Sequence, residues 1–399
     1  MKKLPPRPPK KAFDSTHRPV VGIAFTQGLA RLEKMRQGIV DYAKEHGGWT
    51  FLFKPEIIGP SIDWLKHAHA DGAFVFMLTP KDRQVARALA MPVVNLGAHI
   101  APGTIPSVLT DNRRIGRMAA EYFLGLGFRQ LGFYGANTWY GRERRAGFAD
   151  AARQAGAECK SLIESVSSSS PEQQRRLEHW LRELRPPVGI MASIDMRAAM
   201  VVDACARTGL RVPDEVAVMG VDNDQFVCEQ GLVPLTSIVR NEWKLGWEAA
   251  AMLDGLMAGA KPPRKPVFVE PVRVEARKST STLPVTDPFL ARLVAEARAN
   301  LDKPFGVEWL MARGNCSRRW LEMRFHATLG RTPLEVLNLM RVGRARDLLG
   351  DASLSLSDIA RQCGFTDSRR FRLVFNKHMG ATPRQYRRDR LRAPAVAIE

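Results

Sequence analysis

Short apolar runs alternate with amphipathic stretches along most of the chain. The stretches between the runs, such as Leu32–His46 and Arg114–Leu126, place apolar residues at helical spacing. The runs fit strands and are Val20–Phe25, Ala73–Leu78, Pro92–Leu96, Leu131–Tyr134, Val188–Ala192, Val216–Val221, Ser237–Val239 and Val267–Val269. Apolar strands that alternate with helices are typical of parallel sheets covered on both faces. The pattern therefore predicts an α/β domain over residues 19–278, built either as one large doubly wound sheet or as two lobes with a cleft.

The pattern changes after residues 279–287, a polar segment interrupted by a proline. We interpret this segment as a linker, because residues 288–392 are Arg-rich and helical throughout. The basic, proline-rich residues 1–18 have almost nothing to bury and are predicted to be a disordered tail, and residues 393–399 form a second tail.

Two stretches of the C-terminal region each predict a helix-turn-helix unit. The first has a turn at Gly314–Cys316 followed by a helix over Ser317–Leu329. The second has a turn at Gly364–Thr366, where Gly364 suits a left-handed helix end, followed by a helix over Asp367–Met379. A long helix, Leu334–Leu349, is predicted to join the two units.

The net charge of +19 favours a polyanionic partner, either nucleic acid or an anionic membrane surface. Residues 288–399 hold a net charge of +10 and the first 11 residues hold +5, which leaves +4 for the α/β region. The charge therefore gathers on the part of the chain with the helix-turn-helix pattern. No apolar run is long enough to span a membrane, and no secretory signal precedes the first strand, so we expect a cytoplasmic protein without membrane contact.

The C-terminal region resembles the DNA-binding domain of the AraC family. The resemblance rests on Ile359-Ala360-x3-Gly364-Phe365-Thr366, Phe371-x3-Phe375-Asn376-Lys377 and Gly380-x-Thr382-Pro383-x2-Tyr386-Arg387, and on the similar Ser317-Arg318-Arg319-Trp320-Leu321-Glu322 and Gly330-x-Thr332-Pro333 upstream. Leu373 departs from the pattern, since Arg is common there. Side chains facing away from the predicted cores are the candidates for contacting DNA: Arg318, Arg319, Glu322, His326, Ser368, Arg369, Arg372 and Asn376. For any single one of these charges, a solvated helix face is the alternative.

The α/β region resembles the periplasmic-binding-protein-like sensor domains of LacI/GalR regulators. The matching elements include Thr110-Asp111-Asn112, Arg144-x2-Gly147-Phe148, Ala192-x2-Asp195 and Gly220-x-Asp222-Asn223. The resemblance implies a two-lobed fold and a sugar ligand. Sugars need carboxylate acceptors, a bidentate Arg donor and an aromatic face. The candidates are therefore Asp111, Arg144, Asp195, Asp222 and Trp139, with the adjacent Tyr140 as a second ring that could stack on a sugar. Helix capping is the alternative role for Asp111 and Asp195, and a packing role is the alternative for Trp139.

Other classes of protein have little support. The enzyme motifs G-x-S-x-G, P-loop, H-E-x-x-H and G-x-G-x-x-G are absent, so we predict no catalytic residues and no cofactor. Scattered cysteines and the lone pair His67 and His69 do not predict a metal site. The two resemblances together imply a sugar-controlled regulator that binds double-stranded operator DNA as a homodimer and acts with RNA polymerase. They imply activation of an operon for xylose or a related carbohydrate. A repressor and a non-regulatory sugar-binding protein remain the alternatives.

Overall fold

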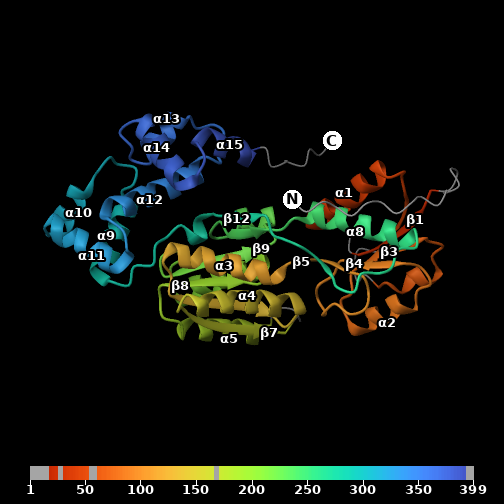
Figure 1. Ribbon diagram of the computed structural model, residues 1–399. Helices are drawn as coiled ribbons and strands as arrows, with labels where there is room; N and C mark the ends of the chain where they lie inside the picture. The colour runs from red at the N-terminus through yellow and green to blue at the C-terminus, as the bar shows by residue number, and fades with distance from the viewer. Residues whose placement is uncertain (1–17, 26–29, 54–60, 166–169, 392–399) are drawn as a thin grey trace.

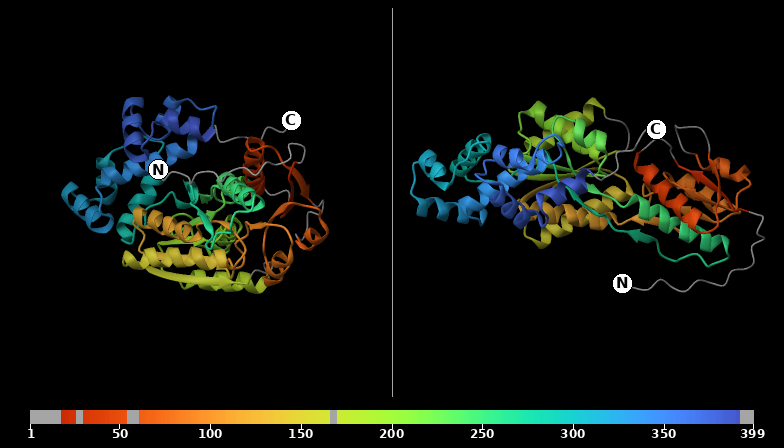
Figure 2. Two further views of the ribbon diagram at one scale, coloured as in Figure 1. Left: turned by 45° about the vertical axis from the view of Figure 1, so that its right-hand side comes forward. Right: turned by 90° about the horizontal axis from the view of Figure 1, so that it is seen from above.

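The computed structural model describes residues 18–25, 30–53, 61–165 and 170–391. The predicted tails therefore lie outside the described residues, apart from residue 18. The chain forms two α/β lobes followed by a helical domain, and Figures 1 and 2 show these as three separate bodies. The α/β region therefore has two lobes with separate sheets, and not the single large sheet that was the alternative.

The N-terminal lobe is built on a parallel sheet in the order β2-β1-β3-β4. Its strands are β1 (Val20–Ala24), β2 (Thr50–Phe53), β3 (Gly72–Val75) and β4 (Val93–Asn95). Beside them lies the parallel pair β5 (Val108–Thr110) and β11 (Val267–Val269). The helices of the lobe are α1 (Ala30–Glu45), η1 (Asp63–His67), α2 (Pro80–Ala88) and α8 (Glu242–Met257). Apolar residues of α1, α8 and the strands form one buried core.

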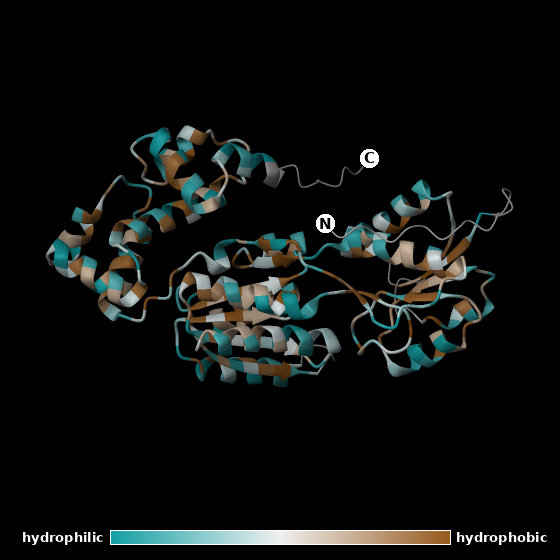
Figure 3. Ribbon diagram, viewed as in Figure 1, coloured by the Kyte–Doolittle hydropathy of each residue, from teal (hydrophilic) through white to brown (hydrophobic). Residues whose placement is uncertain are grey.

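The C-terminal lobe has a six-stranded sheet in the order β12-β10-β9-β8-β6-β7, in which only β12 is antiparallel to its neighbour. Its strands are β6 (Gln130–Ala136), β7 (Glu158–Glu164), β8 (Val188–Ala192), β9 (Val216–Val221), β10 (Thr236–Val239) and β12 (Arg273–Glu275). Its helices are α3 (Asn112–Leu126), α4 (Trp139–Gln154), α5 (Pro171–Arg182), α6 (Asp195–Thr208), α7 (Gln225–Gln230) and η2 (Lys278–Thr280). Separate apolar cores lie on the α3/α4 side and on the α5/α6 side, which explains the continuous apolar strands. Figure 3 shows this concentration of apolar residues along the sheet.

The chain crosses between the lobes three times: from β5 to α3, from β10 to α8, and from β11 to β12. Polar residues at these crossings therefore lie at the hinge, beside whatever occupies the space between the lobes.

The helical domain contains two helix-turn-helix units joined by one long helix. Its helices are α9 (Pro288–Ala299), α10 (Val307–Gly314), α11 (Arg318–Leu329), α12 (Pro333–Leu348), α13 (Leu356–Gln362), α14 (Ser368–Met379) and α15 (Pro383–Leu391). The first unit has its own core and the second has another, with α12 contributing to both. Gly364 adopts the predicted left-handed conformation, with φ of 67°. In the first unit it is Asn315, not Gly314, that turns left-handed.

The segment 279–287 begins inside the C-terminal lobe, although its polarity suggested a solvent-exposed linker. Ser279 is fully buried and donates from Oγ to the carbonyl of Val218 at 2.6 Å. Thr280 is hydrogen-bonded to Tyr122, and Leu283 packs into the core of the first helix-turn-helix unit. The hydroxyl groups of Ser279 and Thr280 are therefore hydrogen-bonded within the lobe instead of being exposed to solvent. The segment attaches the helical domain closely to the C-terminal lobe.

Candidate functional site

A cavity of about 180 Å³ lies between the two lobes. Residues of both lobes and of the hinge line it: Phe76, Leu96, Gly97, Ala98, His99, Thr110, Asn112, Tyr140, Arg144, Ile194, Asp222 and Arg240. Apolar residues and a few convergent charged groups are typical of the lining of a small-molecule site. Two predicted ligand residues, Arg144 and Asp222, lie in this lining.

Arg144 lies on α4 with only 2% of its surface exposed. Its Nε donates to Asn112 Oδ1 at 2.9 Å, and its Nη1 donates to the carbonyl of Ser193. Its guanidinium also lies 5.0 Å from the centre of the Tyr140 ring. Helix α3 can approach α4 this closely because Gly116 has no side chain. A Cβ at this position would overlap the carbonyl oxygen of Arg144. The buried cation is thus held in one orientation at the cavity wall.

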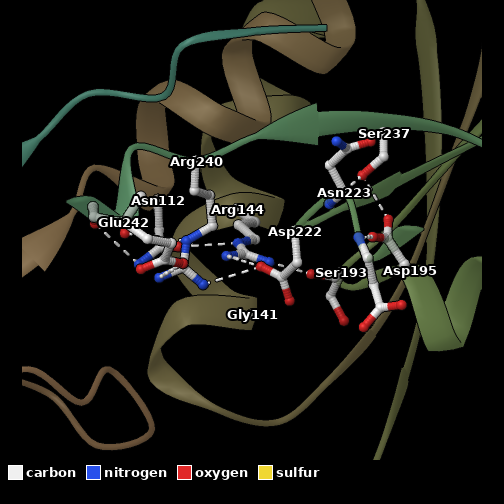
Figure 4. A network of polar contacts seen from close by, with 12 residues as sticks. Asn112, Gly141, Arg144, Ser193, Asp195, Asp222, Asn223, Ser237, Arg240 and Glu242 are labelled. Atoms are coloured by element: carbon white, nitrogen blue, oxygen red, sulfur yellow. Dashed lines mark hydrogen bonds and ion pairs between the residues drawn. The ribbon is translucent and has the colours of Figure 1, made fainter. Parts of the chain in front are cut away.

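Asp222 directly follows β9 and projects its carboxylate toward Arg144 and Arg240 (Figure 4). Its Oδ1 accepts a hydrogen bond from Arg240 Nη1 at 3.0 Å and lies 4.0 Å from Arg144 Nη2. Its backbone has φ of 108°, which is unusual for a residue with a side chain. Such backbone strain is concentrated at functional sites, where surrounding contacts maintain it.

Arg240 is a cavity residue that sequence analysis missed. It follows β10 at the second crossing, where Nε donates to Thr110 Oγ1 at 3.2 Å and Nη2 pairs with Glu242 Oε1 at 3.0 Å. Burial opposes its charge, but the carboxylates of Glu242 and Asp222 together raise the pKa of Arg240 above its ordinary value. The available signal was its place directly after an apolar strand, which it shares with Asp222.

Asp111 and Asp195 lie outside the cavity lining. Asp111 accepts from the Arg114 N–H at 2.8 Å and caps α3, as its alternative role predicted. Asp195 is buried and accepts from Ser237 Oγ at 2.6 Å and from the Asp224 N–H at 2.8 Å. Burial and the nearby Asp222 carboxylate raise the pKa of Asp195 to about 7. Figure 4 shows Asp195 and Ser237 on the far side of the Asp222 loop from Arg240, so Asp195 supports this loop.

Trp139 also lies beside the cavity and not in its lining. Its backbone N–H donates to the carbonyl of His99 at 2.8 Å. Its ring stacks on Phe268, with the ring centroids 6.5 Å apart. The next residue, Tyr140, lines the cavity and donates its N–H to the carbonyl of Ala98 at 3.0 Å. The first turn of α4 therefore binds the N-terminal lobe through two backbone hydrogen bonds, and of the two candidate rings it is that of Tyr140, not of Trp139, that lines the cavity.

The predicted DNA-contacting residues lie on the second helix of each helix-turn-helix unit. Ser317 caps α11 and Asp367 caps α14, each through its side chain. Arg318, Arg319, His326, Arg369, Arg372 and Asn376 are exposed. Glu322 is half-buried and accepts from Arg318 Nε at 2.9 Å, and half-buried Ser368 bonds to Ser357 at 3.3 Å. The four exposed candidate arginines on these two helices provide both the charge and the donors that DNA recognition requires.

Comparisons with known proteins agree with both halves of this description. Residues 120–280 match the periplasmic binding protein-like domain, and residues 310–389 match a helix-turn-helix domain, which is of the AraC type. A binding-protein-like domain joined to an AraC-type domain defines a ligand-responsive transcription regulator, and the chain belongs to this class.

Its relatives include regulatory proteins that it matches over most of their length. The chain is 28% identical over 388 residues to the xylose operon regulatory protein of Escherichia coli K12, covering 94% of this chain and 98% of that protein. It is 27% identical over 350 residues to the xylose operon regulatory protein of Haemophilus influenzae, covering 85% and 90%. Its fold is similar to the structure of the xylose-binding transcription activator xylR, with a TM-score of 0.66 and 24% identity over 94% of this chain and 99% of that one.

Two further structural findings concern membranes and metal ions. Among the described helices, none is long and apolar enough to cross a membrane. Within the described residues, no group of three or more His, Cys, Asp or Glu side chains is placed to hold a metal ion.

Proposed function

We propose that the protein is a sugar-responsive activator of transcription, which binds xylose or a related sugar in the cavity between its lobes. The observation that carries this proposal is the convergence of Arg144, Asp222 and Arg240 on one cavity beside the Tyr140 ring. Sugar hydroxyls both donate and accept, so a fixed carboxylate flanked by two guanidinium groups can bind neighbouring hydroxyls. The Tyr140 ring provides an apolar surface for the C–H face.

The relatives support the choice of ligand. Both regulatory proteins carry xylose in their names, and the structural relative is described as xylose-binding and as an activator. Asn112 and Thr110 add uncharged polar groups to the cavity, which suits a neutral sugar better than a strongly charged metabolite.

The proposed DNA partner is a double-stranded operator, bound in the cytoplasm by a homodimer. Two helix-turn-helix units per chain give four recognition helices per dimer, so the operator contains two extended half-sites. Activation requires productive contact with RNA polymerase, which is the partner that the AraC-type domain implies.

Isothermal titration of the full chain with D-xylose, L-arabinose, D-ribose and D-glucose tests the ligand. We expect saturable, one-site binding of at least one pentose and loss of that binding in Arg144→Gln. Arg153→Gln is the matched control, because Arg153 lies on the same helix with its side chain exposed. Absence of heat for every sugar, or equal binding by the Arg144 variant, contradicts the proposed site.

A further inference from the structure

Two large apolar side chains are exposed at the same position of the two recognition helices. Met323 on α11 is 63% exposed and Leu373 on α14 is 66% exposed. They are 50 residues apart in the sequence, as are the helix caps Ser317 and Asp367. In the described part of the C-terminal domain, Leu334 at 38% is the other exposed large apolar side chain. Two of these three exposed apolar side chains, Met323 and Leu373, therefore lie at equivalent positions of the two recognition helices.

That position faces directly away from the core. Leu321 and Phe325 are buried on α11, and Phe371 and Phe375 are buried on α14. With about 3.6 residues per turn, the residue midway between each buried pair projects from the opposite side of the helix. The outermost residue of each recognition helix is thus apolar, and folding of the chain does not bury it.

Polar residues flank each apolar side chain along the same helix face. Arg319, Met323 and His326 follow the spacing i, i+4, i+7 on α11, and all three are exposed. Arg369, Leu373 and Asn376 repeat this order on α14, again all exposed. Each helix thus presents a cation, an apolar group and a hydrogen-bonding group in a row. The flanking arginines favour a polyanion over an apolar protein surface as the partner of this row.

The apolar group in each row has one matching feature in the major groove of DNA. Base edges there present donors and acceptors, except for the C5-methyl group of thymine. We propose that Met323 and Leu373 each contact a thymine methyl group, so that the operator carries one required thymine for each recognition helix. This inference rests on the proposed operator binding and adds to it which bases the two helices specify.

The test removes single methyl groups from the DNA. The full chain selects its preferred site from a library of randomised duplexes, and each thymine of that site is then replaced in turn by deoxyuridine. Deoxyuridine keeps the hydrogen bonds of thymine and lacks only the methyl group. Burial of one methyl corresponds to about a fourfold change in affinity. We expect wild-type affinity to fall about fourfold at one thymine for each recognition helix.

Variants then assign each thymine to a side chain. Met323→Ala and Leu373→Ala are exposed truncations. In each half-site, each variant is expected to become insensitive to deoxyuridine at one thymine and to stay sensitive at the other. Leu334→Ala is the matched control and is expected to keep both sensitivities. Circular dichroism confirms that each variant retains its helical content.

The possible failures are distinguishable. A chain that selects a specific site but tolerates deoxyuridine everywhere overturns the methyl contacts and leaves operator binding intact. Full sensitivity in both alanine variants also overturns the assignment. A chain that selects no sequence at all refutes operator recognition, and the methyl contacts with it.

Discussion

The guanidinium of Arg144 and the carboxylate of Asp222 face each other with Nη2 and Oδ1 4.0 Å apart, which is within ion-pair range but beyond a hydrogen bond. Other contacts hold both groups: Arg144 is bonded to Asn112 and Ser193, and Asp222 to Arg240. The pair is therefore preorganised. A hydroxyl group that accepts from Arg144 and donates to Asp222 completes this arrangement without moving either side chain.

Replacing Asp222 with Asn tests this relationship. The amide has the same shape but lacks the charge that Arg144 and Arg240 face, so we expect sugar affinity to fall at least about tenfold, or about 1.4 kcal/mol. Operator affinity without sugar should be unchanged, because Asp222 lies in the sensor lobe. Calorimetry and operator titration measure the two quantities. Asp203→Asn, at an exposed position of α6, is the control and should bind sugar normally. Undiminished sugar binding by Asp222→Asn would place the ligand elsewhere.

The arginines of α14 are expected to read bases. Arg369→Ala or Arg372→Ala should each cost about 1–3 kcal/mol on the selected site and much less on unrelated DNA. Fluorescence anisotropy at several salt concentrations measures both affinities. Arg292→Ala, on α9 and outside the helix-turn-helix units, should leave binding unchanged. An equal loss on every sequence, with a shallower salt dependence, would instead identify that arginine as a phosphate contact.

Asp195 makes stability depend on pH. Its pKa is about 7 in the folded chain, mainly because it is buried, against an ordinary 3.8. The folded chain therefore holds a proton that the unfolded chain lacks between about pH 4 and pH 7. This proton uptake stabilises the folded chain fully below about pH 4. The contribution to the free energy of unfolding is lost as the pH rises through 7, at up to about 1.4 kcal/mol per pH unit. Asp195→Asn stays neutral, so its advantage over wild type should grow from pH 5 to pH 8 in urea denaturation. Parallel curves for the two proteins would show that Asp195 is ionised throughout.

We expect contacts between the C-terminal lobe and the helical domain to transmit the effect of sugar binding to the DNA-binding helices. Arg298 of α9 pairs with Asp214 of the lobe and donates from Nη2 to Thr282 at 3.1 Å, and Arg331 donates to the carbonyl of Gly125 at 3.2 Å. Asp214→Asn should leave sugar affinity and sugar-free operator affinity intact, yet reduce the effect of sugar on operator affinity by up to about fivefold. Operator titrations with and without sugar give this ratio. Glu172→Gln on α5 is the control. A full sugar effect in Asp214→Asn would assign the coupling to other contacts.

The sequence predicts the two domain types well because their signals are local. Apolar strands, helix caps and the glycine at the second turn follow from neighbouring residues, and the motifs that resemble LacI/GalR sensor domains point to Arg144 and Asp222. Arg240 was missed because its function depends on Thr110 and Glu242 meeting it at the hinge, which no local pattern shows. Trp139 and Tyr140 are adjacent, and which of the two rings lines the cavity depends on how the first turn of α4 bonds to Ala98 and His99 of the other lobe. The burial of Ser279 likewise depends on Val218, far away in the sequence.

Sugar in the cleft and operator on the helical domain should each change the affinity of the chain for the other. The decisive measurement is the affinity of the full chain for its selected operator, with and without saturating D-xylose or the pentose that calorimetry identifies. We predict a change of about 5- to 150-fold, and the operator should change sugar affinity by the same factor. Operator affinity that is identical in the presence of every sugar that binds would contradict the account.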